Sequence, residues 1–178
     1  MSNNKKTAVF GIYPSVTQAE RAVDALVSEG FSSDDISVLM PDSKSSKDFA
    51  HEKNTKAPEG ATTGVAAGGT IGGTLGLLAG IGALAIPGVG PLIAAGPIMA
   101  ALGGAAVGSA TGGVIGGLVG MGIPEFEAKR YDAKIREGNV LISVHTEDSE
   151  QRDIAREIFK RNDAEDISTG SEASAKSA

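Results

Sequence analysis

Few residues of this 178-residue chain have the types and spacing that chemistry needs. The segment 80–85, Gly-Ile-Gly-Ala-Leu-Ala, satisfies the loose glycine pattern of a dinucleotide-binding loop. That pattern also requires a preceding strand and a helix whose start faces the phosphates. Residues 80–85 instead fall inside an apolar run for which we predict a helix, so we reject a dinucleotide site. No Gly-Lys-Ser or Gly-Lys-Thr sequence follows a glycine loop, which excludes a P-loop.

The histidines and the paired carboxylates are the remaining candidates. His51 lies in a polar stretch and His145 ends a predicted strand, so neither has a partner ligand or nucleophile beside it in the sequence. The carboxylate pairs at 34–35 and 165–166 each precede a predicted strand, where such residues are typical of turns. We therefore predict no catalytic residue, no metal site and no cofactor, and we expect that the protein is not an enzyme.

Composition narrows the class of protein further. The chain has no cysteine, so disulfides and thiolate metal sites are excluded. Its net charge is -6 and only 4% of its residues are aromatic, which disfavours nucleic acid as a partner. No apolar run of signal-peptide length follows the N-terminus, so we expect no export signal. The expected location is the cytoplasm, or a membrane with the folded domain facing the cytoplasm.

The dominant feature is a segment without a single charge, from residue 60 to residue 124, in which glycine recurs every fourth position. Because residues four apart share a helix face, each glycine series predicts a bare stripe against which another backbone can pack. Between the series lies 86–91, Ile-Pro-Gly-Val-Gly-Pro, which cannot continue a helix. We predict a glycine-zipper helical hairpin over 60–123. Its helix-packing residues are Gly64, Gly68, Gly72, Gly76 and Gly80 in the first helix and Gly104, Gly108, Gly112, Gly116 and Gly120 in the second.

Such glycine-rich helices are stable only in an environment that offsets the cost of their glycines. Each glycine costs about 1 kcal/mol relative to alanine in a water-exposed helix, so the helices require either tight helix–helix contact or lipid. A helix of about 25 residues is about 37 Å long, which exceeds the hydrocarbon core of about 30 Å. Our leading interpretation is a hairpin that spans or re-enters the membrane. The alternatives are a soluble homo-oligomer whose hairpins bury one another, and burial within one monomer.

The two ends of the chain are related to each other. A short apolar strand is predicted at 9–13 and another at 141–145, and each precedes an amphipathic helix and a second strand. The first helix is expected to start at the capping-box pattern 17–20, Thr-Gln-Ala-Glu, and the second at Ser149. We therefore predict an α+β fold, a split β-α-β (ferredoxin-like) sandwich with four antiparallel strands and two helices on one face. The glycine-zipper hairpin would be inserted between the two units. The other sheet face, with Leu141, Ser143 and His145, is expected to stay open for a partner.

These patterns divide the chain into five parts. Residues 1–40 form the first β-α-β half, 41–59 a flexible linker, and 60–123 the hairpin. Residues 124–169 hold a connector helix and the second β-α-β half, and 170–178 form a disordered tail. The connector helix, at 125–137, has few apolar residues and is expected to lie on the sandwich.

Five segments resemble a known family. The strand at 9–13, the helix start at 19–23 (Ala-Glu-Arg-Ala-Val) and the strand at 35–39 are similar to the bacterial general stress protein 17M-like (heat-induced stress protein) domain. The stretches 80–88 and 122–131 resemble glycine-zipper members of that group. The resemblance implies a stress-induced, non-secreted bacterial protein, and it carries over no catalytic residue.

These observations together predict a non-enzymatic general stress protein. It would be associated with the cytoplasmic membrane through the glycine-zipper hairpin, with the bilayer and other copies of itself as partners and no nucleic acid. A soluble homo-oligomeric scaffold is the alternative function. A small-ligand sensor that uses the open sheet face near His145 is a third.

Overall fold

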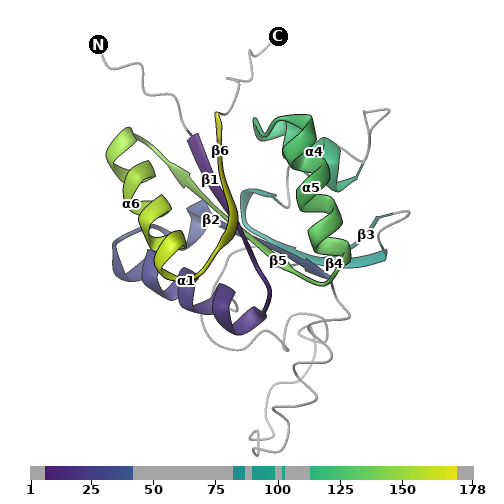
Figure 1. The fold of residues 1–178 in the computed structure, drawn as a ribbon, viewed down its shortest axis with the longest axis horizontal. Coiled ribbons are helices and arrows are strands. Elements are labelled where there is room, and N and C mark those ends of the chain that lie inside the picture. Colours follow the sequence, from purple (N-terminus) through teal and green to yellow (C-terminus); the bar gives the residue numbers. More distant parts are fainter. Residues whose placement is uncertain (1–6, 42–81, 87–89, 99–101, 103–112, 172–178) are drawn as a thin grey trace, which may run out of the picture.

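The protein is an antiparallel sheet with helices packed against both of its faces (Figure 1). The computed structural model describes residues 7–41, 82–86, 90–98, 102 and 113–171. The strands are β1 (Thr7–Tyr13), β2 (Ile36–Pro41), β3 (Gly82–Ile86), β4 (Gly90–Ala95), β5 (Val140–Thr146) and β6 (Glu165–Ser171). The helices are α1 (Val16–Ser28), α4 (Val114–Gly120), α5 (Glu125–Arg136) and α6 (Ser149–Arg161), with a short 3-10 turn, η1 (Ser33–Asp35).

The two related ends of the chain form the middle of the sheet. The strand order is β3-β4-β2-β5-β1-β6, and each neighbouring pair of strands is antiparallel. The units β1-α1-β2 and β5-α6-β6 interleave, since β5 lies between β1 and β2. The predicted α+β fold with an antiparallel sheet and packed helices is thus confirmed.

Both long helices start one or two residues before the positions that the sequence predicts. We expected the first cap in the Thr17–Glu20 pattern, but the Ser15 hydroxyl accepts the bond from the Gln18 backbone N–H. Asp148, rather than Ser149, caps α6 by accepting from the Gln151 backbone N–H. Each cap satisfies a donor that the first turn would otherwise leave unpaired.

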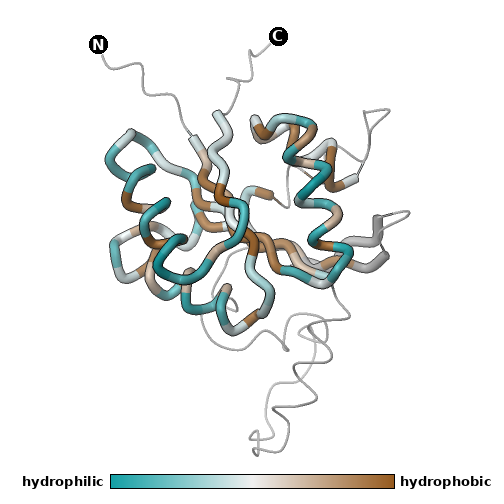
Figure 2. Tube along the Cα trace, in the orientation of Figure 1, coloured by the Kyte–Doolittle hydropathy of each residue, from teal (hydrophilic) through white to brown (hydrophobic). Residues whose placement is uncertain are grey.

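The first face of the sheet is covered by α1 and α6. Apolar side chains of β1, β2 and β5 meet Leu26 of α1 and Phe159 of α6 in one buried cluster. Within this cluster the rings of Tyr13 and Phe159 lie edge to face, with centroids 6.1 Å apart. Figure 2 shows the hydrophobic residues gathered in the sheet and the hydrophilic ones along the outer sides of the helices.

The second face is covered as well, and this corrects an expectation. Leu141, on the face that we expected to be open, is fully buried in a second cluster with Leu118 of α4 and Tyr131 of α5. The connector helix α5 therefore lies on the sandwich, as its sequence predicts. Ser143, on the same face as Leu141, is 1% exposed. This part of the face offers no open surface for a ligand or partner.

The first predicted glycine helix is wrong where the structure describes it. Residues Gly82–Ile86 and Gly90–Ala95 are strands that pair with each other, and β4 pairs with β2 from Val38↔Ala95 to Pro41↔Leu92. The sequence 86–91 therefore joins two strands, not two helices. Gly96 leaves β4 at a φ of +77°, where its Cα lies so close to Ser37 that a Cβ would come within 2.9 Å of the Ser37 Cα. Residues 60–81 lie outside the described residues.

The second predicted helix is interrupted. Gly113 has a φ of +89°, a backbone conformation that cannot continue a right-handed helix. The helix α4 therefore begins after Gly113 as a separate helix. Gly112 is outside the described residues, and Gly116 and Gly120 lie in the short helix α4. A single unbroken helix over the second glycine series, 104–120, is therefore excluded.

Candidate functional site

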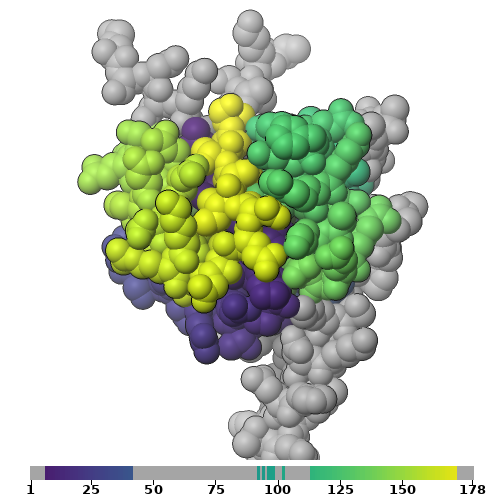
Figure 3. Space-filling view, in the orientation of Figure 1, coloured from purple at the N-terminus to yellow at the C-terminus, as the bar shows by residue number. Residues whose placement is uncertain are grey.

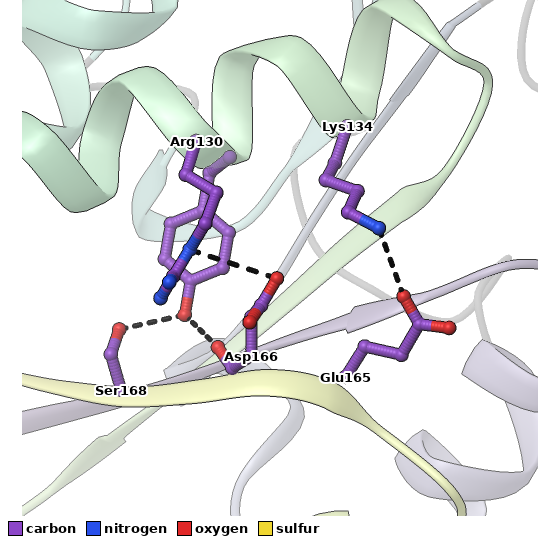
Figure 4. Close-up of polar contacts among 6 residues, drawn as sticks. Arg130, Lys134, Glu165, Asp166 and Ser168 are labelled. Carbon is purple, nitrogen blue, oxygen red and sulfur yellow. Dashed lines mark hydrogen bonds and ion pairs between the residues drawn. The ribbon is translucent and has the colours of Figure 1, made fainter.

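The most developed polar site joins α5 to the edge strand β6 (Figure 4). The Tyr131 hydroxyl donates to the backbone carbonyl oxygen of Asp166 and shares a hydrogen bond of 2.7 Å with the Ser168 hydroxyl. Tyr131 is fully buried, and burial raises the pKa of its hydroxyl to about 12. The phenol is therefore neutral at physiological pH and acts as a donor, not as a base.

Two ion pairs flank this tyrosine. Lys134 Nζ lies 3.2 Å from Glu165 Oε2, and Arg130 Nε lies 3.7 Å from Asp166 Oδ2. The hydrogen bond to Glu165 raises the pKa of Lys134. Both pairs are partly exposed, so solvent screens them and each is a weak contribution to stability. The carboxylate pair at 165–166, read from the sequence as a turn, thus also fastens the connector helix to β6.

The backbone of β6 is shaped to reach α5. Phe10 pairs with Ser168 and Ile12 with Glu165, so two residues of β6, Asp166 and Ile167, lie opposite Gly11 alone. Such a bulge bends the strand locally, and Asp166 adopts a φ of +50° within it. The bend turns the Asp166 carbonyl toward Tyr131, because that carbonyl is the acceptor of the tyrosine hydroxyl.

A second contact holds the corner between α4 and α5 against the end of β6. Gly122 has a φ of +88°, and a Cβ built on it would overlap the backbone carbonyl of Ser171. A Cβ on Gly170 would lie 2.8 Å from the Met121 carbonyl oxygen. Two backbones therefore meet here with no room for a side chain. The glycine repeat does not predict this contact, although Gly122 directly precedes the Ile-Pro sequence before α5.

The structure places two of the ten predicted packing glycines. A Cβ on Gly120 would meet nothing within 4 Å, and Gly116 is half-buried. The α4 glycine that closely contacts another residue is Gly117, where a Cβ would lie 2.7 Å from Leu102 Cδ2. Gly117 does not belong to the predicted series. The other eight lie outside the described residues: Gly64, Gly68, Gly72, Gly76, Gly80, Gly104, Gly108 and Gly112.

The remaining candidates show no reactive arrangement. His145 is half-buried opposite Ala8 of β1, and Asp34 and Asp35 form the turn η1, whose start is capped by Ser32. Within the described parts of the chain, no three His, Asp or Glu side chains gather as a metal site would require. Over the same residues, no helix combines the length and hydrophobicity needed to cross a bilayer. His51 and the segment 80–81 are outside those parts.

The first β-α-β unit lies within a match to a known protein family. Residues 8–85 are similar to the heat induced stress protein YflT domain. The match runs from β1 into β3 and confirms the heat-induced stress protein resemblance for that part of the chain. It leaves the second unit and the resemblance at 122–131 untested. Comparisons with curated proteins and with solved structures gave no match.

The two tyrosines of the chain give a matched test of the α5–β6 contact. Tyr131→Phe removes a buried donor with two partners, so we expect a loss of about 1–2 kcal/mol in the free energy of unfolding. Tyr13→Phe is the control, because the buried Tyr13 hydroxyl has no hydrogen-bond partner among the described residues. We expect that change to be neutral or slightly stabilising. Urea unfolding of both variants measures the difference, and equal losses would contradict the assigned contact.

Proposed function

We propose that the protein is a non-enzymatic stress-response protein that works by self-association, with the glycine-rich segment 60–123 as its assembling element. The stress role follows the similarity of residues 8–85 to the heat induced stress protein YflT domain. The non-enzymatic role is supported by the polar side chains of the α5–β6 contact, which are engaged with one another. We assign β2-β5-β1-β6 with α1 and α6 to the ferredoxin-like class.

The position of β3 and β4 is the observation that carries this proposal. The middle of the predicted hairpin contains β3 and β4, of which β4 pairs with β2 of the sheet and β3 pairs with β4. Leu92 and Ala94 of β4 are fully buried in the same cluster as Leu118 and Tyr131. A segment fixed to the sheet in this way favours a protein-only assembly over a hairpin inserted as a whole into lipid.

Membrane attachment is the second candidate function. Residues 60–81 still contain no charged side chain, a length of apolar sequence near that of one membrane span. Under this hypothesis residues 60–81 insert into the cytoplasmic membrane, and the folded domain faces the cytoplasm. The glycine series of 64–80 would then pack copies together within the bilayer.

Substitution within the glycine series tests self-association. We expect Gly72→Leu or Gly112→Leu to reduce the assembled protein to smaller species, because a leucine side chain separates backbones that glycine allows to touch. Ala133→Leu is the control, since it adds the same side chain at an exposed position of α5 outside the series. Sedimentation velocity measures the size of each variant. If Gly72→Leu and Gly112→Leu keep the wild-type size, the segment is not the assembling element.

A further inference from the structure

The outermost of the described strands, β3 and β6, differ in how well each is protected from pairing with another strand. An outer strand presents unpaired backbone N–H and C=O groups, and proteins block such edges with charges, bulges or covering elements. β6 has all three devices. It carries Glu165 and Asp166, it is bulged opposite Gly11, and its end lies against Gly122. Figure 3 shows β6 in yellow, flanked by α6 on one side and by α4 and α5 on the other.

The opposite edge, formed by β3, has neither a charged residue nor a bulge. β3 reads Gly-Ala-Leu-Ala-Ile and pairs with β4 without a register shift, from Gly82↔Ala94 to Ile86↔Gly90. Neither β3 nor β4 contains a charged residue. Regular pairing leaves the outer backbone of β3 extended over its whole length, which is the form that accepts another strand.

We propose that β3 pairs antiparallel with β3 of a second copy of this chain. The inference names a contact for the self-association proposed above, but it uses a different surface from the glycine series. A two-fold axis through the strand centre brings the same five residues opposite one another, so the edge is complementary to itself. The strand adds no like charges to that contact, although each copy has a net charge of -6.

Because the edge at β6 is protected, such an assembly would stop at two copies. The six strands of each copy would form one sheet of twelve, and both of its ends would then be β6. Since β6 is charged and bulged, the sheet would not grow further by edge pairing. A partner of a different sequence would have no such two-fold relation to β3. The contact is therefore a closed dimer rather than a filament.

Lysine substitutions at the two edges test the proposal. Ala85→Lys places a charge within the proposed contact, opposite Ala83 of the other copy, and we expect it to raise the dimer dissociation constant at least about tenfold. Ser171→Lys adds the same charge to the exposed end of β6 and should leave the constant unchanged. Sedimentation equilibrium of the full chain measures both, and circular dichroism confirms that each variant is folded. Equal constants for the two variants would overturn the edge contact.

Cross-linking gives a second readout that does not depend on a destabilised variant. The chain has no cysteine, so a single introduced cysteine can form a disulfide only between copies. Directly opposite residues of an antiparallel pair are close enough for such a bond. The two-fold axis brings Leu84 opposite Leu84 of the other copy, so we expect Leu84→Cys to give a covalent dimer under mild oxidation and Ser171→Cys to give none. No dimer from Leu84→Cys, or a wild-type monomer at all concentrations, would overturn the proposal.

The glycine variants separate this contact from the proposed function. If Gly72→Leu disperses the assembly while Ala85→Lys has no effect, the glycine segment assembles the protein and the β3 contact is wrong. If Ala85→Lys dissociates the protein and Gly72→Leu keeps the wild-type size, the β3 contact stands and the assembling role of the glycine series is wrong.

Discussion

Gly122→Ala is expected to lower the free energy of unfolding by about 3 kcal/mol, and the melting temperature by about 10 °C. Two causes combine at this position. The φ of +88° is strained for any residue with a Cβ, and that Cβ would overlap the carbonyl of Ser171. Because the overlapping group is backbone, the corner between α4 and α5 must move away from the end of β6. Thermal unfolding followed by circular dichroism measures the loss.

Two other glycines separate these causes. Gly30 has a φ of +95° with nothing within 4 Å of a built Cβ, so Gly30→Ala carries only the conformational cost, about 1 kcal/mol. Gly120 lies in α4 in open space, and Gly120→Ala should be stabilising by up to about 1 kcal/mol because alanine favours a helix. A Gly122→Ala loss no greater than that of Gly30→Ala would show that the α4–α5 corner does not contact β6.

Phe159→Ala should cost about 3–5 kcal/mol, the range for large aromatic side chains removed from a core. Phe159 is fully buried, contacts the ring of Tyr13 edge to face, and would lie 3.0 Å from a Cβ built on Gly11. Its removal therefore leaves a cavity at the centre of the cluster between α6 and the sheet. Urea unfolding of the purified full chain gives the change in the free energy of unfolding.

The same helix supplies the control for Phe159. Ile154 is 39% exposed on α6, so Ile154→Ala should cost less than about 1 kcal/mol. If the two substitutions had similar costs, α6 would not be packed against the sheet through the face that carries Phe159.

The related ends of the chain could be predicted because their signals are local. Each unit has an apolar strand, a capping sequence and an amphipathic helix within about 35 residues, which is the scale on which periodicity is informative. Buried positions such as Leu26 and Ile158 follow from the helix period alone. The boundaries shifted by one or two residues, as Ser15 and Asp148 show at the two caps.

The hairpin could not be assigned from the glycine spacing, because its pairing is not local. β4 pairs with β2, so Ala95 lies opposite Val38, which is far away in the sequence. A spacing of four arises easily in a glycine-rich sequence, and the Pro-Gly at 87–88 is a turn signal for strands as much as a helix breaker. Residues 82–86 form a strand because they pair within the sheet, and their local sequence alone does not determine that structure.

The covered second face did leave a signal in the sequence. Strands β2 and β5 contain almost continuous apolar runs, at 36–40 and 140–144, rather than strict alternation. Such runs are typical of strands buried on both faces. The contact of Tyr131 with β6 left no comparable signal, because it depends on where α5 lies and on the bend at Asp166.

Fractionation of cells that express the chain is the most direct test of the central claim, that the protein assembles by protein–protein contacts. The pellet is extracted with carbonate and then with detergent, and the soluble fraction is sized by gel filtration with light scattering. We predict recovery in the soluble fraction, without detergent, as a particle larger than one 17.9 kDa chain. Release from the pellet only by detergent, or a soluble monomer, would contradict the account.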